Sequence, residues 1–387
     1  MTTIKQELQR EQDKARRNVV PVIYTRGTHY EIGFDVGKTF AEMIREHVDH
    51  YWPLNETYMI LYETQEGKGI YDETLACVEK QYSQYVREIR GTADGSGVPF
   101  HKLFLMHLDD IITIAASKDA QRSLEPVGCS AVVCNQPGQE ILGHNEDALS
   151  ETLSRWYLID AHINEPNLPE EKFCSLSYAG FLPGYTMGYN QHGLVFSVNT
   201  LYASTLRTGK TPRYFLARAL LGAETYTQLE AILRNDGHGA AEGFSVNLSF
   251  HQEVPRTFRN IEVAPAELGQ SSSKISTVTA NPGEYFYHCN KYLQMLIDEN
   301  PRAIRSSIHR GKAIEKHSPP ETLRDVVEIL SDQSDEELPV YRELGERSKT
   351  ICTGVFDLLK KTWAIYIDKP DRTAPVIVLP MFFKNDE

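Results

Sequence analysis

The chain has 387 residues, a formal net charge of −13 at pH 7 and 41% hydrophobic residues, which is enough for a large core in one or more domains. The negative charge disfavours nucleic acid as a partner and mildly favours a small cationic molecule, because a phosphate backbone is bound by clustered lysine and arginine. No apolar stretch approaches the roughly 18 residues of a membrane span, the N-terminus shows no signal peptide, and the six cysteines have neither zinc-site nor disulfide spacing, so we expect a cytoplasmic protein.

The first third of the chain is predicted to be helical. Apolar residues recur at four-residue steps from Ile32 to Ile44, which is the spacing of one helix face, and 103–116 is a second apolar helix. Residues 119–128 form a polar linker with Pro126 near its end. This composition predicts an exposed loop that could be cleaved.

Short strands are predicted after residue 128, and helices return between and after them. The strands are expected at 129–135, 140–145, 155–162, 173–179, 194–199, 243–250 and 258–263. The helices are expected at about 212–235 and 290–330, followed by a surface loop at 331–337 and a closing hairpin of strands at 353–356 and 363–367. Strands interleaved with paired helices are typical of a layered α/β architecture.

The first two strands are predicted to form a hairpin. Pro137 and Gly138 suit the two central positions of a tight turn. If the turn is centred between them, facing residues have numbers that sum to 275, and Cys129 faces Glu146. The open end of the hairpin then gathers a thiol, an amide and two carboxylates, from Cys129, Asn145, Glu146 and Asp147.

The bond between Gly128 and Cys129 is a place where the chain could cut itself. Cleavage would leave Cys129 with a free α-amine beside its own thiol, and an α-amine with a pKa of about 8 can be neutral and accept the thiol proton. Gly128 has no side chain that would block attack of the sulfur on its carbonyl. The alternative is that Cys129, at the start of an apolar strand, is a small core residue.

Short motifs match one known family, in order and spacing, over most of the chain. They lie at 27–33, 88–99, 128–129, 143–147, 188–194, 288–290 and 306–310, with Asn247 between 188–194 and 288–290. The chain therefore resembles the acyl-CoA:isopenicillin N acyltransferase family of self-processing N-terminal nucleophile hydrolases. The resemblance implies an α/β fold, a four-layer αββα sandwich, in which 1–128 become an α chain and 129–387 a catalytic β chain. The two chains are expected to stay associated as one intertwined domain.

The resemblance also assigns roles to individual residues. It implies that Cys129 is the nucleophile, that Asp147 orients the region around it, and that Asn247 stabilises the oxyanion. Without the resemblance, Asp147 would be interpreted as a turn cap at a strand end. Asn247 would be interpreted as a polar residue on the outer face of a strand, since it alternates with Val246 and Leu248.

Four further residues are expected to support the site. Ser307 and Arg310 align with a serine and arginine pair near the family's nucleophile, although an arginine on a helix is by default solvated. The family commonly has hydroxyl residues at both positions after the nucleophile, whereas here Ser130 keeps one and Ala131 lacks the other. This departure puts the rate of self-cleavage in question. The fourth residue is Asn145, which belongs to the motif at 143–147 that ends in Asp147.

A metal site at the end of the hairpin is the alternative for its polar side chains. Alternation along the strand puts His144 and Glu146 on one face and Asp147 on the other, which speaks against a shared ion. We therefore expect no metal and no cofactor.

Residues 182–197 are similar to family members that hydrolyse N-β-alanyl amines. The resemblance implies that conjugates such as β-alanyl-dopamine and carcinine are cleaved to the free amine and β-alanine. The expected partners are this small substrate and, within one precursor, the α and β chains, with further oligomerisation left open. The alternatives are CoA-dependent acyl transfer, hydrolysis of other N-acyl amines, and an unprocessed relative without enzymatic activity. Hydrolysis is favoured over transfer, because no lysine and arginine cluster near the site would bind the CoA phosphates.

Overall fold

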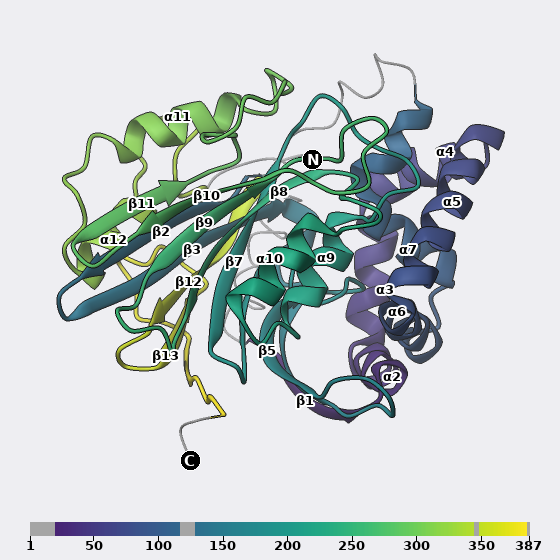
Figure 1. Ribbon diagram of the computed structural model, residues 1–387, viewed down its shortest axis with the longest axis horizontal. Coiled ribbons are helices and arrows are strands. Elements are labelled where there is room, and N and C mark those ends of the chain that lie inside the picture. Colours follow the sequence, from purple (N-terminus) through teal and green to yellow (C-terminus); the bar gives the residue numbers. More distant parts are fainter. Residues whose placement is uncertain (1–19, 117–127, 344–347, 385–387) are drawn as a thin grey trace, which may run out of the picture.

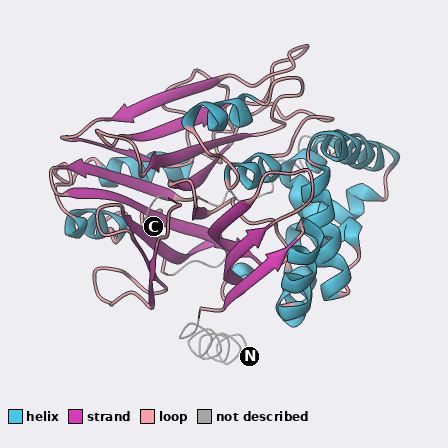
Figure 2. Cartoon of the chain, turned by 60° about the horizontal axis from the view of Figure 1, so that its bottom comes forward, coloured by secondary structure: helices cyan, strands magenta, loops and turns pink. Residues whose placement is uncertain are grey.

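The chain folds around two stacked β-sheets that carry helices on their outer faces (Figure 1 and Figure 2). The computed structural model describes residues 20–116, 128–343 and 348–384. Most of the predicted linker, 119–127, lies outside the described residues, as does the N-terminal segment 1–19, for which no signal peptide is expected. Within the described ranges, no helix is both long and apolar enough to cross a membrane.

The larger sheet has eight strands, and its neighbouring strands are antiparallel except for the parallel pair β1 and β4. In spatial order the strands are β1 (Val22–Gly27), β4 (Trp156–Ile163), β5 (Glu171–Tyr178), β6 (Met187–Asn190), β7 (Leu194–Leu201), β8 (Gly243–Phe250), β9 (Phe258–Val263) and β10 (Ile275–Ala280).

The second sheet has six antiparallel strands and contains the predicted hairpin. In spatial order they are β11 (Glu284–His288), β2 (Ser130–Gln136), β3 (Gln139–Leu149), β12 (Ser348–Asp357), β13 (Thr362–Tyr366) and β14 (Ile377–Pro380). Ser130 pairs with Asn145 and Gln136 with Gln139, so the predicted register is confirmed. The predicted closing hairpin is also confirmed, as β12 and β13.

The helices form two groups, one at each side of the sheets (Figure 1). The first group comes from the N-terminal third: α2 (His29–Thr39), α3 (Ala41–His50), α4 (Met59–Tyr62), α5 (Gln65–Gln81), α6 (Ser83–Ser96) and α7 (Phe100–Leu108). The helices α9 (Arg213–Leu220) and α10 (Tyr226–Arg234) share its core, whereas α11 (Arg305–Ile314) and α12 (Leu323–Leu330) lie on the other side.

Three layers of buried apolar side chains join these elements, and together they define the fold. The layer between the two sheets includes Leu142, Phe356, Leu158 and Met187. The layer between the six-stranded sheet and α11 and α12 includes Val132, Ile141, Ala313 and Leu330. The layer between the eight-stranded sheet and the first helix group includes Phe196, Val246, Ile32 and Phe215. The predicted four-layer αββα sandwich is therefore confirmed.

In strand β2 apolar residues follow one another without alternating with polar ones, because the strand is buried on both faces. Val133 faces the layer between the sheets and Val132 faces the helix layer. Because both faces of the strand are covered, neither side selects polar residues.

The predicted helix at 290–330 is wrong over much of its length. Only α11 and α12 are helical, and 290–304 forms turns and irregular structure. The buried carboxylate of Glu262 accepts the main-chain N–H groups of Leu293, Gln294 and Met295, which would otherwise begin the helical ladder. Pro319 and Pro320 separate α11 from α12, since proline has no N–H to donate.

The other predicted helices exist but are interrupted. The segment 212–235 is split into α9 and α10, and Thr225 caps the second helix by accepting the N–H of Gln228. The apolar face from Ile32 to Ile44 spans α2 and α3. The helix predicted at 103–116 ends at Leu108, because the φ of 44° at Asp109 does not fit a right-handed helix, and a 3-10 segment, Asp109–Ala115, follows.

The strands missed by the sequence prediction are β1, β6, β10, β11 and β14. Strands β10, β11 and β14 lie at a sheet edge and carry a weak apolar signal; three consecutive residues of β10, for example, are exposed. Strand β6 is buried but has only four residues, too few to show a periodicity. Strand β1 does alternate between exposed and buried residues, and it lies parallel to β4, far along the chain.

Candidate active site

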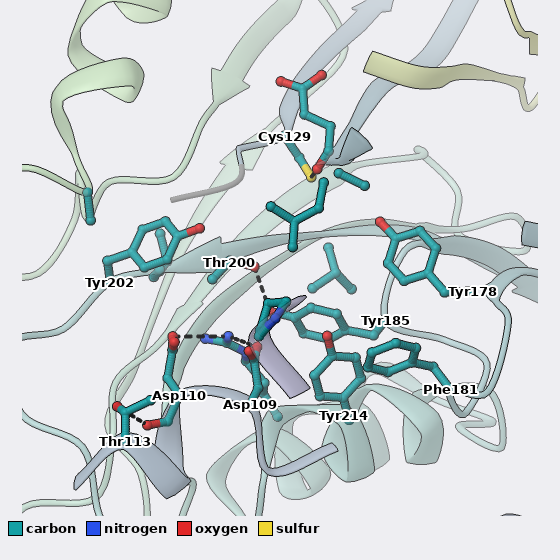
Figure 3. A pocket seen from close by; sticks show the side chains of 18 of the residues that line it. Asp109, Asp110, Thr113, Cys129, Tyr178, Phe181, Tyr185, Thr200, Tyr202 and Tyr214 are labelled. Atoms are coloured by element: carbon teal, nitrogen blue, oxygen red, sulfur yellow. Dashed lines mark hydrogen bonds and ion pairs between the residues drawn. The ribbon is translucent and has the colours of Figure 1, made fainter. Parts of the chain in front are cut away.

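Cys129 lies directly before β2 and lines a cavity of about 210 Å³ (Figure 3). Its side chain is 7% exposed. The sulfur lies 3.6 Å from Oε1 of Glu146 and 4.0 Å from the main-chain oxygen of Asp147. The predicted facing of Cys129 and Glu146 is thus confirmed, and the hairpin register is its direct cause.

The surroundings of Cys129 keep its thiol protonated. Burial raises the pKa of the thiol well above its ordinary value, and the carboxylates of Glu146 and Asp147 raise it further. The main chain of Asp147 and the guanidinium of Arg310 act in the opposite direction and do not outweigh these effects. A reaction at this sulfur therefore needs a nearby base that takes the proton as the sulfur attacks.

Gly128 occupies a place that no other residue would fit without displacing its neighbours. A Cβ atom on residue 128 would lie 2.8 Å from Oδ1 of Asn290, and closer still to the guanidinium of Arg310. Both of these side chains are buried and hydrogen-bonded to each other over 2.6 Å. Gly128 is consequently packed directly against the polar side chains of Asn290 and Arg310.

Arg310 connects the residues around Cys129. Its Nη1 donates to the main-chain carbonyl of Cys129 and, over 2.8 Å, to the hydroxyl of Ser130. The hydroxyl of Ser307 lies 3.4 Å from Nη2 of Arg310 and accepts the main-chain N–H of Asn290 over 2.8 Å. Arg310 is fully buried in α11, so the default expectation of a solvated arginine is wrong. The structure brings Ser130, Ser307 and Arg310 together with Cys129.

Asp147 is buried inside β3 and is not a turn cap. Its Oδ1 accepts the hydroxyl of Thr350 over 2.6 Å, and its Oδ2 lies 3.5 Å from Nε of Arg342. Burial raises the pKa of Asp147, while Arg342 and Arg310 lower it. Asp147 thus belongs to a charged pair beside the nucleophile, and its partner Arg342 was not identified from the sequence.

Asn145 joins β3 to the segments that follow it in space and does not face the thiol. Its amide donates to the main-chain oxygens of Leu330 and Val340 over 2.7 and 3.1 Å, and its Oδ1 accepts the hydroxyl of Thr353 over 2.6 Å. These contacts satisfy the whole amide. The position fixes the end of α12 to the hairpin.

Asn247 is buried within β8, so its interpretation as an outer-face residue is wrong. Its amide donates to Ser197 Oγ over 3.2 Å and to Asn199 Oδ1 over 2.7 Å, and its Oδ1 accepts from Asn260 over 2.9 Å. Among the described residues that line the cavity, Cys129 is included and Asn247 is not. An oxyanion at Cys129 could reach this amide only if one of its present hydrogen bonds were released.

Several cavity residues were missed by the sequence prediction. Tyr178 donates its hydroxyl to Oε1 of Glu146, the same oxygen that faces the thiol. Figure 3 shows aromatic side chains along the sides of the cavity, with Cys129 at one end and an acidic pair at the opposite end. The aromatic residues and the acidic pair are Tyr178, Phe181, Tyr185, Tyr202, Tyr214, Asp109 and Asp110. Only the acidic pair left a signal in the sequence, as two adjacent aspartates directly after an apolar helix.

Ligand-type atoms do converge at the hairpin. One donor atom each of Cys129, His144 and Glu146 lies within 4.8 Å of the others, and Nε2 of His144 is 3.2 Å from Oε2 of Glu146. The alternation of side chains along β3 separates Asp147 from this group, as predicted. The prediction did not foresee that Cys129, across the hairpin, supplies the third ligand-type atom. The carboxylate of Glu146 already makes hydrogen-bond contacts with the thiol of Cys129, the imidazole of His144 and the hydroxyl of Tyr178.

Comparison with known proteins places the chain among acyl-transfer and amide-cleaving enzymes. The family model described as acyl-coenzyme A:6-aminopenicillanic acid acyl-transferase matches residues 134–372. The chain is 44% identical over 379 residues to the beta-alanyl-dopamine/carcinine hydrolase of Drosophila melanogaster, which covers 95% of this chain and 98% of that protein.

Two solved structures are also similar to the chain, at low sequence identity. The penicillin V acylase from Agrobacterium tumefaciens is 14% identical with a TM-score of 0.37, over 62% of this chain and 82% of that one. A variant of the conjugated bile acid hydrolase from Clostridium perfringens is 13% identical with a TM-score of 0.36, over 67% of this chain and all of that one.

Proposed function

Because the chain belongs to the acyl-coenzyme A:6-aminopenicillanic acid acyl-transferase family, we propose that it is a self-processing cysteine amidohydrolase that releases amines from N-β-alanyl conjugates. The observation that carries this proposal is the 44% identity to the beta-alanyl-dopamine/carcinine hydrolase over nearly the full length of both proteins. The substrates are β-alanyl-dopamine and carcinine, and the products are β-alanine with dopamine or histamine.

The first step is cleavage of the chain at its own nucleophile. The sulfur of Cys129 attacks the carbonyl carbon of Gly128, the acyl group moves from nitrogen to sulfur, and water hydrolyses the thioester. No free α-amine exists at Cys129 before this step, so another group must accept the thiol proton. The carboxylate of Glu146, 3.6 Å from the sulfur, is placed to do so. The products are an α chain of 1–128 and a β chain of 129–387, which stay together as a heterodimer through the shared core.

The second step is turnover of the substrate by the mature N-terminal cysteine. The α-amine of Cys129 takes the thiol proton, and the sulfur attacks the amide carbonyl of the conjugate. The tetrahedral intermediate collapses as the ammonium returns the proton to the leaving amine, and the β-alanyl group remains on sulfur as a thioester. Water, deprotonated by the same α-amine, then releases β-alanine and restores the thiol. Asn247 is retained as the proposed oxyanion donor, on condition that it gives up a hydrogen bond to Ser197 or Asn199.

The charge of the cavity supports hydrolysis over acyl transfer from CoA. Its lining includes four carboxylates, Asp109, Asp110, Glu146 and Asp147, against the guanidinium of Arg213. A cavity of this sign attracts the ammonium group of a β-alanyl conjugate and repels the phosphates of CoA. Transfer to or from CoA therefore remains the second candidate.

The cysteines support a cytoplasmic location, which is part of the proposal. All six are free thiols, as is usual in a reducing compartment. Cell fractionation with an antibody to the β chain tests the location.

Denaturing electrophoresis and an amine-release assay together test the proposed function. The purified protein should give two fragments, and the larger should begin Cys-Ser-Ala-Val. Incubation with β-alanyl-dopamine and carcinine should release free amine, whereas a panel of other acyl amines should react more slowly. Cys129→Ala should remain uncut and inactive, and Cys134→Ala, a buried thiol on the same strand, should be cut and active. An uncut wild-type chain, or no release from either β-alanyl conjugate, would overturn the proposal.

A further inference from the structure

The end of the cavity opposite Cys129 is built from acidic side chains. Figure 3 shows Asp109 and Asp110 at this end, with Tyr185 and Tyr214 beside Asp109 and Thr200 nearer the sulfur. The two aspartates belong to the 3-10 segment that follows α7. Their side chains keep 16% and 24% of their area exposed, and both line the cavity, so their carboxylates are accessible from it.

Positive charge at this end is insufficient for the carboxylates that share it. The guanidinium of Arg213 donates to Asp109 and lies 3.3 Å from Asp110, and its Nε is 3.8 Å from the carboxylate of Glu242. Three carboxylates thus surround one guanidinium, and both Arg213 and Glu242 are buried. Burial and the neighbouring acids raise the pKa of Asp110 to about 6 and that of Glu242 to about 8, so Glu242 carries a proton at neutral pH and the excess negative charge falls on Asp109 and Asp110. An incoming cation or hydrogen-bond donor would reduce this imbalance.

The polar atoms at this end differ in whether a ligand can reach them. Oε1 of Glu242 and Nε of Arg213 are buried without a hydrogen bond. Tyr58 already donates its hydroxyl to Oδ1 of Asp109 over 2.9 Å, which leaves Asp110 as the more available acceptor. Glu242 does not line the cavity and the Nε of Arg213 is itself a donor, so the acceptors that a ligand donor can reach from the cavity are the carboxylates of Asp109 and Asp110.

A metal ion is a poor occupant for this cluster. One oxygen each of Asp109, Asp110 and Glu242 lies within 4.8 Å of the others, a spacing that could suit an ion. The guanidinium of Arg213 already lies among these oxygens and contacts all three carboxylates, so a metal would have to displace a buried cation. An organic donor can instead bind on the cavity side of the acids without moving Arg213.

The length of the substrate decides which of its ends reaches the acids. In a β-alanyl conjugate only two methylene groups separate the ammonium from the scissile carbonyl, so this ammonium stays near Cys129 and Glu146. The leaving amine carries an aromatic ring on its own two-carbon chain, in the direction away from the acyl group. A ring placed in this direction would lie against Tyr185 and Tyr214, with its polar edge toward the acidic end.

We propose that Asp109 and Asp110 recognise the ring of the leaving amine and select rings that carry hydrogen-bond donors. The assignment rests on the proposed function, since it places the scissile amide at Cys129. A catechol and an imidazole differ in size and shape, but both present O–H or N–H donors at the ring edge. A pair of carboxylates accepts from either, which explains how one cavity serves both β-alanyl-dopamine and carcinine.

A series of conjugates with one acyl group tests this assignment. The β-alanyl amides of phenethylamine, tyramine, dopamine and histamine differ in the donors on the ring, and the phenethylamine amide has none. For the wild-type protein, kcat/KM for the dopamine and histamine conjugates should exceed that for the phenethylamine conjugate at least about tenfold, through a lower KM. Asp110→Asn, which keeps the shape and removes the charge, should reduce this preference to within about threefold.

The matched control is Asp72→Asn on α5, whose aspartate is 58% exposed and pairs with Lys68 on the same helix. It should keep the wild-type preference. If Asp110→Asn does not fold, competition by the free amines decides: dopamine should inhibit the wild-type protein more strongly than phenethylamine. Equal cleavage of all four conjugates by the wild type, or an equal loss on all of them in Asp110→Asn, would overturn the assignment and leave the proposed function intact. Failure of the wild type to cleave any of the four would overturn both.

Discussion

Arg310 and Cys129 are 181 residues apart in the chain, yet the guanidinium of Arg310 donates to the main-chain carbonyl of Cys129. The same side chain also holds Ser130 and Asn290, so it fixes the main chain on the C-terminal side of the proposed cleavage site. Because the scissile bond precedes Cys129, the angle at which the sulfur meets the Gly128 carbonyl depends on this anchor. Arg310 acts in this scheme as a positioning residue.

Replacement of Arg310 by lysine should slow self-cleavage at least about tenfold, because a single ammonium cannot donate to Cys129, Ser130 and Asn290 in the fork geometry of a guanidinium. The measurement is the rate at which the two fragments appear from freshly made precursor. Arg305→Lys is the control, since Arg305 begins the same helix but is 54% exposed and pairs with Glu337. Cleavage of Arg310→Lys at the wild-type rate would show that the anchor is dispensable.

Gly128→Ala should also slow self-cleavage by an order of magnitude or more, because its Cβ would meet Asn290 and Arg310 and shift the scissile carbonyl. The fragment assay measures this effect. Gly69→Ala in α5 is a suitable comparison, since a Cβ there meets nothing within 4 Å. That variant should be processed normally and gain up to about 1 kcal/mol of stability from its higher helix propensity. Normal processing of Gly128→Ala would contradict the steric account.

Glu146→Gln has two opposing effects on the reactivity of the Cys129 thiol, and we expect the net result to be slower self-cleavage. Removal of the negative charge lowers the pKa of the thiol, but burial is the larger cause of its raised pKa and remains. The thiol therefore stays protonated, while the base 3.6 Å away is lost. Self-cleavage should fall at least about tenfold.

The pH dependence of self-cleavage distinguishes the two roles of Glu146. If Glu146 is the base, the variant should recover part of its rate as the pH rises and hydroxide replaces the carboxylate. Glu151→Gln, a partly buried acid at the next turn of the chain, should behave as wild type. A faster reaction in Glu146→Gln at neutral pH would mean that its charge only hinders the thiol.

His107 should make the fold sensitive to acid. Burial lowers its pKa to about 4 from 6.5. Its Nε2 accepts the N–H of Leu182 over 2.8 Å, and its Nδ1 lies 2.7 Å from the carbonyl of Leu103, so protonation would set two N–H groups against each other. The unfolded chain binds the proton more readily than the folded one. Stability is therefore complete above pH 6.5 and is lost as the pH falls toward 4.

Urea unfolding of the wild type and of His107→Gln at pH 7 and pH 4.5 measures this effect. Between these values the wild type should lose on the order of 2 kcal/mol more free energy of unfolding than the variant, which follows from about 1.4 kcal/mol per pKa unit. The pKa of His47 is also lowered to about 4, but His47 is present in both proteins and cancels in the comparison. Equal losses in the two proteins would exclude His107 as a cause.

The sequence by itself determined the parts of the site that are close along the chain. The turn at Pro137 and Gly138 fixes the pairing of β2 with β3, and strict alternation then carries Cys129 to Glu146 without help from the rest of the fold. The apolar runs likewise predicted most strands of the core. The succession of motifs identified the family and, through it, the layered sandwich.

Only the tertiary structure decided that Tyr178 and Arg342 complete the site, whereas Arg310 was predicted through the resemblance to the family. Arg310, Tyr178 and Arg342 reach the hairpin because two sheets and a helix layer pack around it, and no periodicity links their positions to Cys129. The first part of the helix predicted at 290–330 is absent for the same reason, since the carboxylate of Glu262 accepts the main-chain N–H groups of Leu293, Gln294 and Met295. Local propensity amounts to a few tenths of a kcal/mol per residue, and a buried charge that needs donors outweighs it.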